Sequence, residues 1–145
     1  MSHNASQVLM GTTASNVKEV SSAVGSIPAG KIVRQKSDGT LSLLKSDGNA
    51  KGISLGKDLS DTDKCAFVRK GLWVPIQLTS AFDPTIGAQV HISDTTGLAI
   101  ASGGGATGMN AIYETGRVGG TGVNGGIQED GTTVGVAYIS FPGGL

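Results

Sequence analysis

The chain has almost no cysteine: of its 145 residues, only Cys65 carries a thiol. A single cysteine cannot form an intrachain disulfide, so no covalent link of that kind holds the fold together. Cys65 begins the apolar run Cys65–Val68, which is typical of a buried strand, and there a thiol behaves as a small hydrophobic side chain. We therefore expect Cys65 to be structural.

Metal ligands are scarce as well. The two histidines, His3 and His91, lie far apart in the sequence, and with one cysteine they supply no ligand set at motif spacing. The run Asp58, Asp61 and Asp63 lacks the glycine and terminal glutamate of a calcium-binding loop, which favours a solvated acidic turn. We expect no metal site and no cofactor.

The chain also lacks an excess of charge of either sign. Eleven basic and eleven acidic residues give a formal net charge of zero, and no cluster of lysine and arginine departs from that balance. Such a chain has no long-range attraction for nucleic acid or for a membrane surface. No apolar run is long enough to span a membrane, and the N-terminus lacks the basic start and apolar block of a secretion signal. We expect synthesis in a cytoplasm.

Aromatic residues make up only 4% of the chain, and their scattered positions provide no platform for stacking nucleic-acid bases. The single tryptophan, Trp73, lies in an apolar run together with Pro75 and Ile76, which is typical of a core residue or of an anchor at a subunit interface. Pro75 cannot donate a backbone hydrogen bond, so it indicates a strand edge or a bulge. The candidate oligomer interface is therefore Trp73, Pro75 and Ile76.

Glycine is abundant, with 24 residues, and it separates short apolar runs. Glycine supplies the backbone conformations of tight turns and costs about 1 kcal/mol in a helix interior, so the composition argues against a helical domain. Asp38-Gly39 and Asp47-Gly48 indicate two successive turns. The strands that we expect are 31–35, 40–44, 51–55, 64–69, 72–78, 88–93, 98–101, 112–118 and 132–141.

Strands at this spacing, without intervening helices, favour an all-β fold: a small β-barrel or β-sandwich-like domain with at most one short helix, expected at 107–113. A glycine-rich segment, about 103–126, is either a loop or an insertion packed against a neighbour. We place the β domain at residues 28–145.

Residues 1–27 form a different region, without proline, aromatic residues or a sustained hydrophobic period. Such a segment buries little area of its own, while ordering costs about 1–2 kcal/mol per residue. We therefore interpret it as an extended N-terminal arm that is fixed only against a partner. Its candidate contact residues are Val8, Leu9, Met10, Val17, Val20 and Val24.

Two glycine motifs match the letters of catalytic or cofactor signatures. Gly52–Gly56 fits the G-x-S-x-G nucleophile elbow around Ser54, and Gly103–Gly108 fits the dinucleotide motif G-x-G-x-x-G. Both signatures require a helix directly after the motif. The polar loop after Gly56 and the short segment after Gly108 provide none, so we interpret both as strands and turns. We expect no enzymatic activity.

From Pro28 onward the order of features resembles the small capsid decoration, or cement, proteins of tailed bacteriophages. The segments that carry the resemblance are 28–33, 52–55, 64–75, 86–92 with 96–99, 113–120 and 131–139. No single segment is diagnostic, and the weight lies in their order.

The resemblance implies a β-barrel-like protein, usually a homotrimer, on the outer surface of an assembled virion head, where it binds the major capsid protein and ties neighbouring capsomers together. Strand addition by the arm is the mode of attachment that we expect, because backbone pairing tolerates almost any sequence. A tail, baseplate or other virion subunit and a surface adhesin module are the alternatives.

Overall fold

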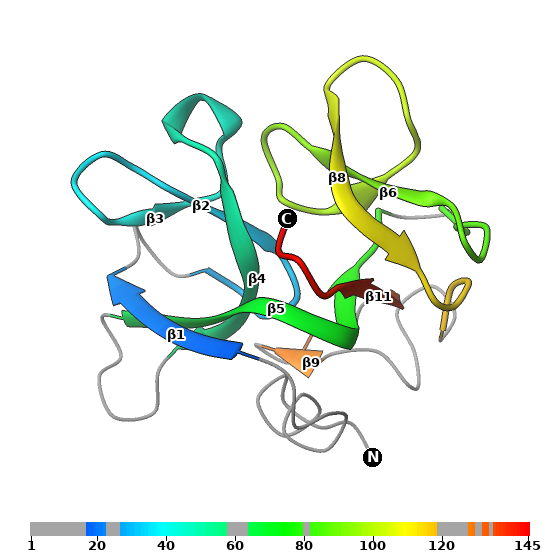
Figure 1. The fold of residues 1–145 in the computed structure, drawn as a ribbon, viewed down its shortest axis with the longest axis horizontal. Helices are drawn as coiled ribbons and strands as arrows, with labels where there is room; N and C mark the ends of the chain where they lie inside the picture. Colours follow the sequence, from blue (N-terminus) through cyan, green and yellow to red (C-terminus); the bar gives the residue numbers. More distant parts are fainter. Residues whose placement is uncertain are drawn as a thin grey trace.

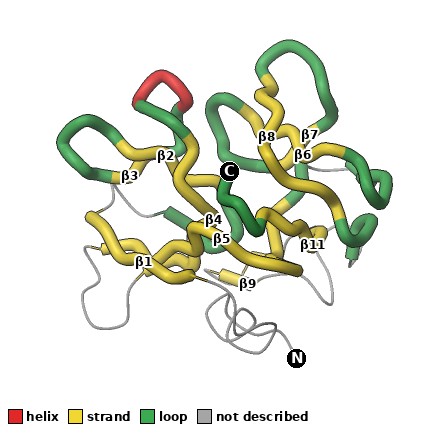
Figure 2. The backbone as a smooth tube through the Cα atoms, viewed as in Figure 1, coloured by secondary structure: helices red, strands yellow, loops and turns green. Residues whose placement is uncertain are grey.

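The computed structural model describes residues 17–22, 27–57, 64–79, 82–118, 128–129, 132–133 and 135–145. For residues 17–22, 57, 128–129 and 132–133 the description covers the backbone alone. The described chain is built almost entirely of β-strands with loops between them (Figures 1 and 2). The all-β class that the glycine pattern predicted is confirmed.

One curled antiparallel sheet contains most of the strands, in the order β3-β2-β4-β5-β11-β8-β6-β7, with β1 also paired to β5. A separate pair is formed by β9 and β10. Figure 2 shows the single helical turn, η1, in the loop before β4. The element bounds are β1 Val17–Ser22, β2 Ile32–Gln35, β3 Leu41–Ser42, η1 Lys45–Asp47, β4 Ala50–Lys57, β5 Lys64–Gln77, β6 Gln89–Ser93, β7 Ala99–Ile100, β8 Ala106–Tyr113, β9 Gln128–Glu129, β10 Thr132–Thr133 and β11 Val136–Phe141.

The long strand β5 connects the two halves of this sheet. Residues 64–70 of β5 pair with β4 and β1, whereas residues 71–77 pair with β11. We call β1 to β4 with residues 64–70 the first half-sheet, and residues 71–77 with β11, β8, β6 and β7 the second half-sheet. The sequence predicted two strands, at 64–69 and 72–78, but they are one continuous strand.

The main hydrophobic core lies between the two half-sheets and includes Ile32, Ile53, Ile76 and Ile139, all with no exposed area. A smaller cluster packs on the opposite face of the first half-sheet. Successive strand residues point to opposite faces, so in β2 Ile32 contributes to the main core while Val33 contributes to the smaller cluster. Both faces of β2 are therefore covered, which explains why Ile32, Val33 and Arg34 are all buried.

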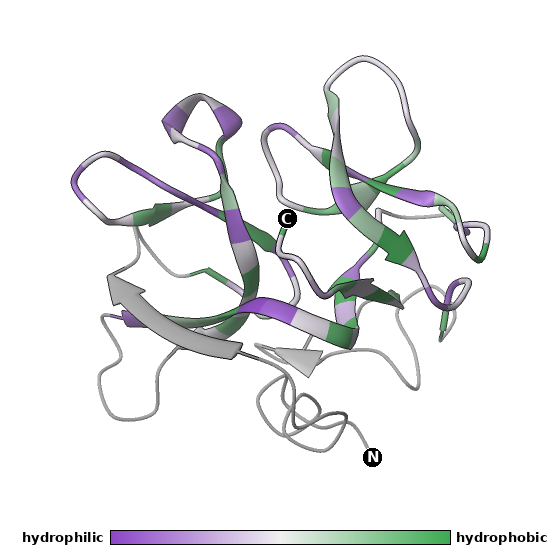
Figure 3. Cartoon of the chain, viewed as in Figure 1, coloured by the Kyte–Doolittle hydropathy of each residue, from purple (hydrophilic) through white to green (hydrophobic). Residues whose placement is uncertain are grey.

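The short helix predicted at 107–113 is wrong, because these residues form most of β8. Burial along β8 alternates: Met109, Ala111 and Tyr113 face the core, and Asn110 and Ile112 face outward. Figure 3 shows that the strand carries both hydrophobic and hydrophilic residues. Pairing with β6 on one side and β11 on the other imposes this period of two. The strand predicted at 112–118 correspondingly ends at Tyr113.

The glycine-rich segment is also reassigned in part, because its beginning forms a turn and then β8. Its residues 119–126 lie outside the described part of the chain. The two Asp-Gly turns are confirmed: Gly39 has a φ of 87° between β2 and β3, and Gly48 ends η1.

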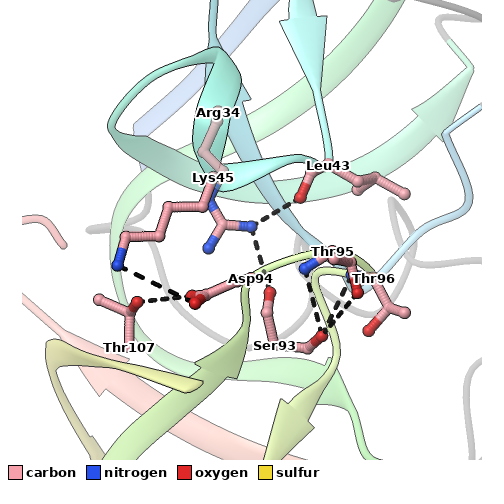
Figure 4. Close-up of polar contacts among 8 residues, drawn as sticks. All are labelled: Arg34, Leu43, Lys45, Ser93, Asp94, Thr95, Thr96 and Thr107. Carbon is pink, nitrogen blue, oxygen red and sulfur yellow. Dashed lines mark hydrogen bonds and ion pairs between the residues drawn. The ribbon is translucent and has the colours of Figure 1, made fainter. Parts of the chain in front are cut away.

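A buried arginine joins the two half-sheets across the core (Figure 4). Arg34 of β2 is 1% exposed, and its Nη1 donates to the carbonyl oxygens of Leu43 at 2.7 Å and Ser93 at 3.3 Å. Burial lowers the pKa of Arg34, an effect that the nearby charge of Asp94 opposes. An arginine nevertheless stays protonated at any ordinary pH, so the joint carries a buried positive charge.

Backbone contacts reinforce this joint. The N–H of Lys45 donates to the carbonyl of Asp94 at 2.8 Å, and the N–H of Ile32 donates to that of Gly97 at 2.9 Å. Gly97 has a φ of 72°, and a Cβ there would lie 2.7 Å from the carbonyl oxygen of Ile32. Only glycine fits this approach, so the turn that ends β6 is fixed against β2.

Replacing Arg34 should destabilise the protein strongly. We expect Arg34→Ala to lower the free energy of unfolding by about 3–5 kcal/mol, because it leaves buried carbonyls without a donor and opens a cavity. The matched control is Lys45→Ala, which removes the exposed ion pair to Asp94 at 4.0 Å and should cost less than about 1 kcal/mol. Urea unfolding measures both, and equal losses would contradict the role given to Arg34.

Tyr113 should make stability fall at alkaline pH. Its side chain is 2% exposed, its hydroxyl has no hydrogen-bond partner among the described residues, and burial raises its pKa to about 12. Between the ordinary pKa, about 10, and 12 the unfolded chain releases this proton first, so stability should fall by about 1.4 kcal/mol per pH unit. Below that window the phenol is neutral in both states and the effect is absent.

The control is Tyr113→Phe. Near pH 7 this variant should be as stable as the original chain or more stable, because it removes an unpaired buried hydroxyl. The difference between the two unfolding curves should then grow above pH 10. Parallel curves from pH 7 to 12 would refute this assignment.

Candidate functional site

Four of the predicted arm contacts, Val8, Leu9, Met10 and Val24, lie outside the described residues. The other two, Val17 and Val20, are in β1, which pairs antiparallel with β5 of the same chain. The expectation that the arm is fixed only against a partner is therefore wrong for residues 17–22. Its physical basis was the lack of a private core, but backbone hydrogen bonds to an existing strand require no such core.

Two of the three predicted interface residues are buried within the chain. Ile76 has no exposed area and belongs to the main core, and Pro75 is buried as well. Neither side chain therefore offers a large surface to a second subunit in this fold, and the oligomer interface stays a prediction. Trp73, at 47% exposed, is the one that lies on the surface.

Pro75 occupies a position that needs no backbone donor. It lies opposite Tyr138 of β11, whose N–H donates to Thr115 Oγ1 and whose carbonyl accepts from Glu114, both away from β5. Pro75 and Tyr138 are thus a pair without mutual hydrogen bonds, and the missing N–H costs the ladder nothing. The sequence analysis indicated a strand edge or a bulge here, and among the described strands β11 is the one that pairs with this part of β5.

A bulge in β5 places Trp73 on the surface. Ile139 lies opposite Val74 and Phe141 lies opposite Gly71, so two residues of β5, Leu72 and Trp73, stand against one residue of β11. That residue is Ser140, whose Oγ accepts a hydrogen bond from the N–H of Trp73 at 3.1 Å. The extra residue bends the strand, which is the usual effect of a bulge.

Trp73 also has a φ of 55°, which makes it the only non-glycine residue with a positive φ in the described chain. For a bulky residue this conformation costs about 1–2 kcal/mol. Glycine would adopt it without strain. A tryptophan at such a position therefore indicates that the exposed indole has a role of its own.

Trp73 lies in a small apolar patch on the outer face of the second half-sheet, which also contains Leu72 and Ile112. Their exposed fractions are 39% for Leu72, 47% for Trp73 and 46% for Ile112. Ile112 of β8 pairs with Ser140, so Ser140 separates it from the bulge, and the serine is only 4% exposed. The Tyr138 ring lies 6.3 Å from that of Trp73. We call Leu72, Trp73 and Ile112 the outer patch.

Sequence reasoning found Trp73 but missed Ile112. The helix expected at 107–113 hid the alternation that directs Met109, Ala111 and Tyr113 inward and leaves Ile112 on the outer face. A strand prediction for this segment would have exposed Ile112 on pattern alone.

The edge of the first half-sheet is a second candidate for interaction. Among the described strands, β1 pairs with β5 alone, and a strand at the edge of a sheet is a template for pairing with a further strand. In Figure 1, β1 runs along the outside of the first half-sheet.

The catalytic-looking motifs have structural roles. Ser54 is completely buried in β4, where its hydroxyl donates to the carbonyl of Pro28 and accepts from the N–H of Lys31. Gly103–Gly108 leads into β8 rather than into a helix. The strand interpretation of Gly52–Gly56 is confirmed.

A shallow pocket of about 280 Å³ lies beside β6 and β7, lined by residues that include Asp83, Gln89, His91 and Ser102. Within the ranges that the structure covers, no three of the side chains that bind metals come together, and no helix is long and apolar enough to cross a membrane. Asp58, Asp61 and Asp63 lie outside these ranges.

No protein-family model matches this chain, and no curated protein is similar to it in sequence.

The strain at Trp73 can be tested with two substitutions that both remove the indole. Trp73→Gly and Trp73→Ala lose the same contact with Tyr138, but only glycine adopts a φ of 55° without strain. We expect the glycine variant to be more stable by about 1 kcal/mol, although glycine is normally the less stable choice in a strand. Urea unfolding of the two variants measures the difference, and a more stable alanine variant would show that the bulge is not strained.

Proposed function

We propose that this protein is a structural virion subunit that binds the outside of an assembled phage head and stabilises it. The observation that carries the proposal is the position of β1, which lies at the edge of the first half-sheet and continues directly into residues 1–16. A strand edge next to a chain segment without acidic or basic side chains is a surface suited to attachment by strand addition.

The composition supports this attachment mode. Residues 2–16 contain no Asp, Glu, Lys or Arg and include the apolar cluster Val8–Met10, so attachment would depend on burial and backbone pairing rather than on ion pairs. The order of segments from Pro28 onward, which resembles decoration proteins, points in the same direction. The major capsid protein is the partner that this proposal requires, and homotrimers would multiply weak contacts through a high effective concentration.

The folded domain is suited to such a role because its rigidity does not depend on a partner. The main core, the Arg34 joint and the continuous strand β5 hold the two half-sheets together within one chain. A subunit of this kind can be made separately and added to a finished particle. Binding that favours the assembled state then stabilises it by mass action.

Head stability tests the proposal. Heads decorated with the protein should melt at a higher temperature than bare heads, and the increase should change little between low and high salt, because exposed ion pairs contribute little. The double substitution Val8→Asp and Leu9→Asp should abolish most of the increase, since it removes burial worth about 1.5–3 kcal/mol per side chain.

The matched control is Ser6→Asp with Gln7→Asp, which adds the same two charges to the same segment without removing an apolar side chain. Decoration by this control should resemble that by the original chain. Equal melting of bare and fully decorated heads would refute the proposal and favour an adhesin module. Polymerisation of the purified protein without heads would favour a tail subunit instead.

A further inference from the structure

The outer patch lies where residues 1–16 leave the described fold. Val17, the first residue of β1, stands opposite Lys70 of β5, and the two strands are antiparallel. Followed toward the N-terminus, the chain therefore heads from Lys70 toward residues 71–73 of β5. Leu72 and Trp73 are the next residues along that path.

The length and composition of residues 1–16 suit this patch. Eight residues lie between Val8 and Val17, and an extended chain spans about 3.3 Å per residue, so Val8–Met10 can reach the patch with length to spare. Gly11 follows Met10 and permits the reversal of direction that such a path needs. Apart from its terminal amine and His3 the segment carries no charged or titratable side chain, so covering the patch would bury no ionised side chain.

The strained indole is the second observation. Backbone geometry at Trp73 favours glycine, and the Ser140 Oγ holds the bulge in place whatever the side chain is. The indole, the isoleucine beside it and Leu72 are each more than a third exposed. Apolar side chains that gather on an outer face in this way mark a surface that something covers.

We propose that Val8–Met10 of the same chain covers Trp73 and Ile112 in the free subunit. The contact does not require a head or a second copy, because a segment tethered beside its target has a high effective concentration. The next step rests on the proposed function: the capsid lattice and the outer patch compete for Val8–Met10, and attachment begins when this segment leaves the patch.

Tryptophan fluorescence reports on this contact directly, because Trp73 is the only tryptophan in the chain. The full-length chain should show blue-shifted emission and weak quenching by acrylamide. Deletion of residues 1–16, which ends before β1, should shift the emission to longer wavelength and increase quenching. Val8→Asp with Leu9→Asp should do the same, whereas the control Ser6→Asp with Gln7→Asp should leave both unchanged.

Ile112→Asp tests the other side of the contact. It should reproduce the red shift, and combining it with the deletion should add nothing further, because both changes break one interaction. Urea unfolding checks that each variant is folded. If the truncated chain or the Ile112→Asp chain is not folded, the chain with Val8→Asp and Leu9→Asp takes its place in the comparison.

Identical emission and quenching in the full-length and truncated chains would overturn the proposal. A blue shift that disappears on dilution would overturn it too and assign the patch to a second copy. Neither result depends on heads, so the proposal can fail while decorated heads are still stabilised. Conversely, truncation could expose Trp73 while decoration leaves the melting temperature of heads unchanged. That result would support the contact within the chain and refute the proposed function.

Discussion

The rest of the structure depends on β5, because this one strand belongs to both halves of the sheet. Its first seven residues form hydrogen bonds with β4 and β1, and its last seven pair with β11. The change of partner requires a bend, and the bulge at Leu72 and Trp73 supplies it. Both the division of the sheet and the main core between its halves follow from that bend.

A strand that bends in this way leaves the far ends of the two half-sheets to be joined by other means. Arg34 provides the joint, since its guanidinium reaches carbonyls of both halves from within the core (Figure 4). A buried charge is a costly way to join two layers, and hydrogen bonds to carbonyls offset only part of that cost. Hydrogen bonds are directional, so the guanidinium fixes the position of the Leu43 carbonyl relative to the Ser93 carbonyl. A purely apolar contact would allow the two segments to slide past each other.

The same bulge connects the fold to its surface. By turning Trp73 outward, it places two large exposed side chains, Trp73 and Ile112, on either side of the small Ser140. Because β1 begins at Val17, opposite Lys70 of β5, the first residue of β1 lies close to the outer patch along β5. A subunit that attaches to a larger assembly needs these features together, which is why the two proposals concern the same part of the molecule.

The all-β class, the Asp-Gly turns and the buried strand around Cys65 could be predicted from the sequence alone. Glycine spacing and short apolar runs are local properties, and turn chemistry depends on neighbouring residues. Pro75 likewise indicated its place on β5, because a missing backbone donor constrains a residue wherever it lies.

Only the tertiary structure decided which apolar residues are covered. Trp73 and Ile76 belong to the same run, yet one lies on the surface and the other in the core, because a bulge set by pairing with β11 separates them. Residues 107–113 became a strand because β6 and β11 flank them, and residues 17–22 form a strand because they pair with β5. Strand pairing joins residues far apart in the sequence, so no local pattern specifies it.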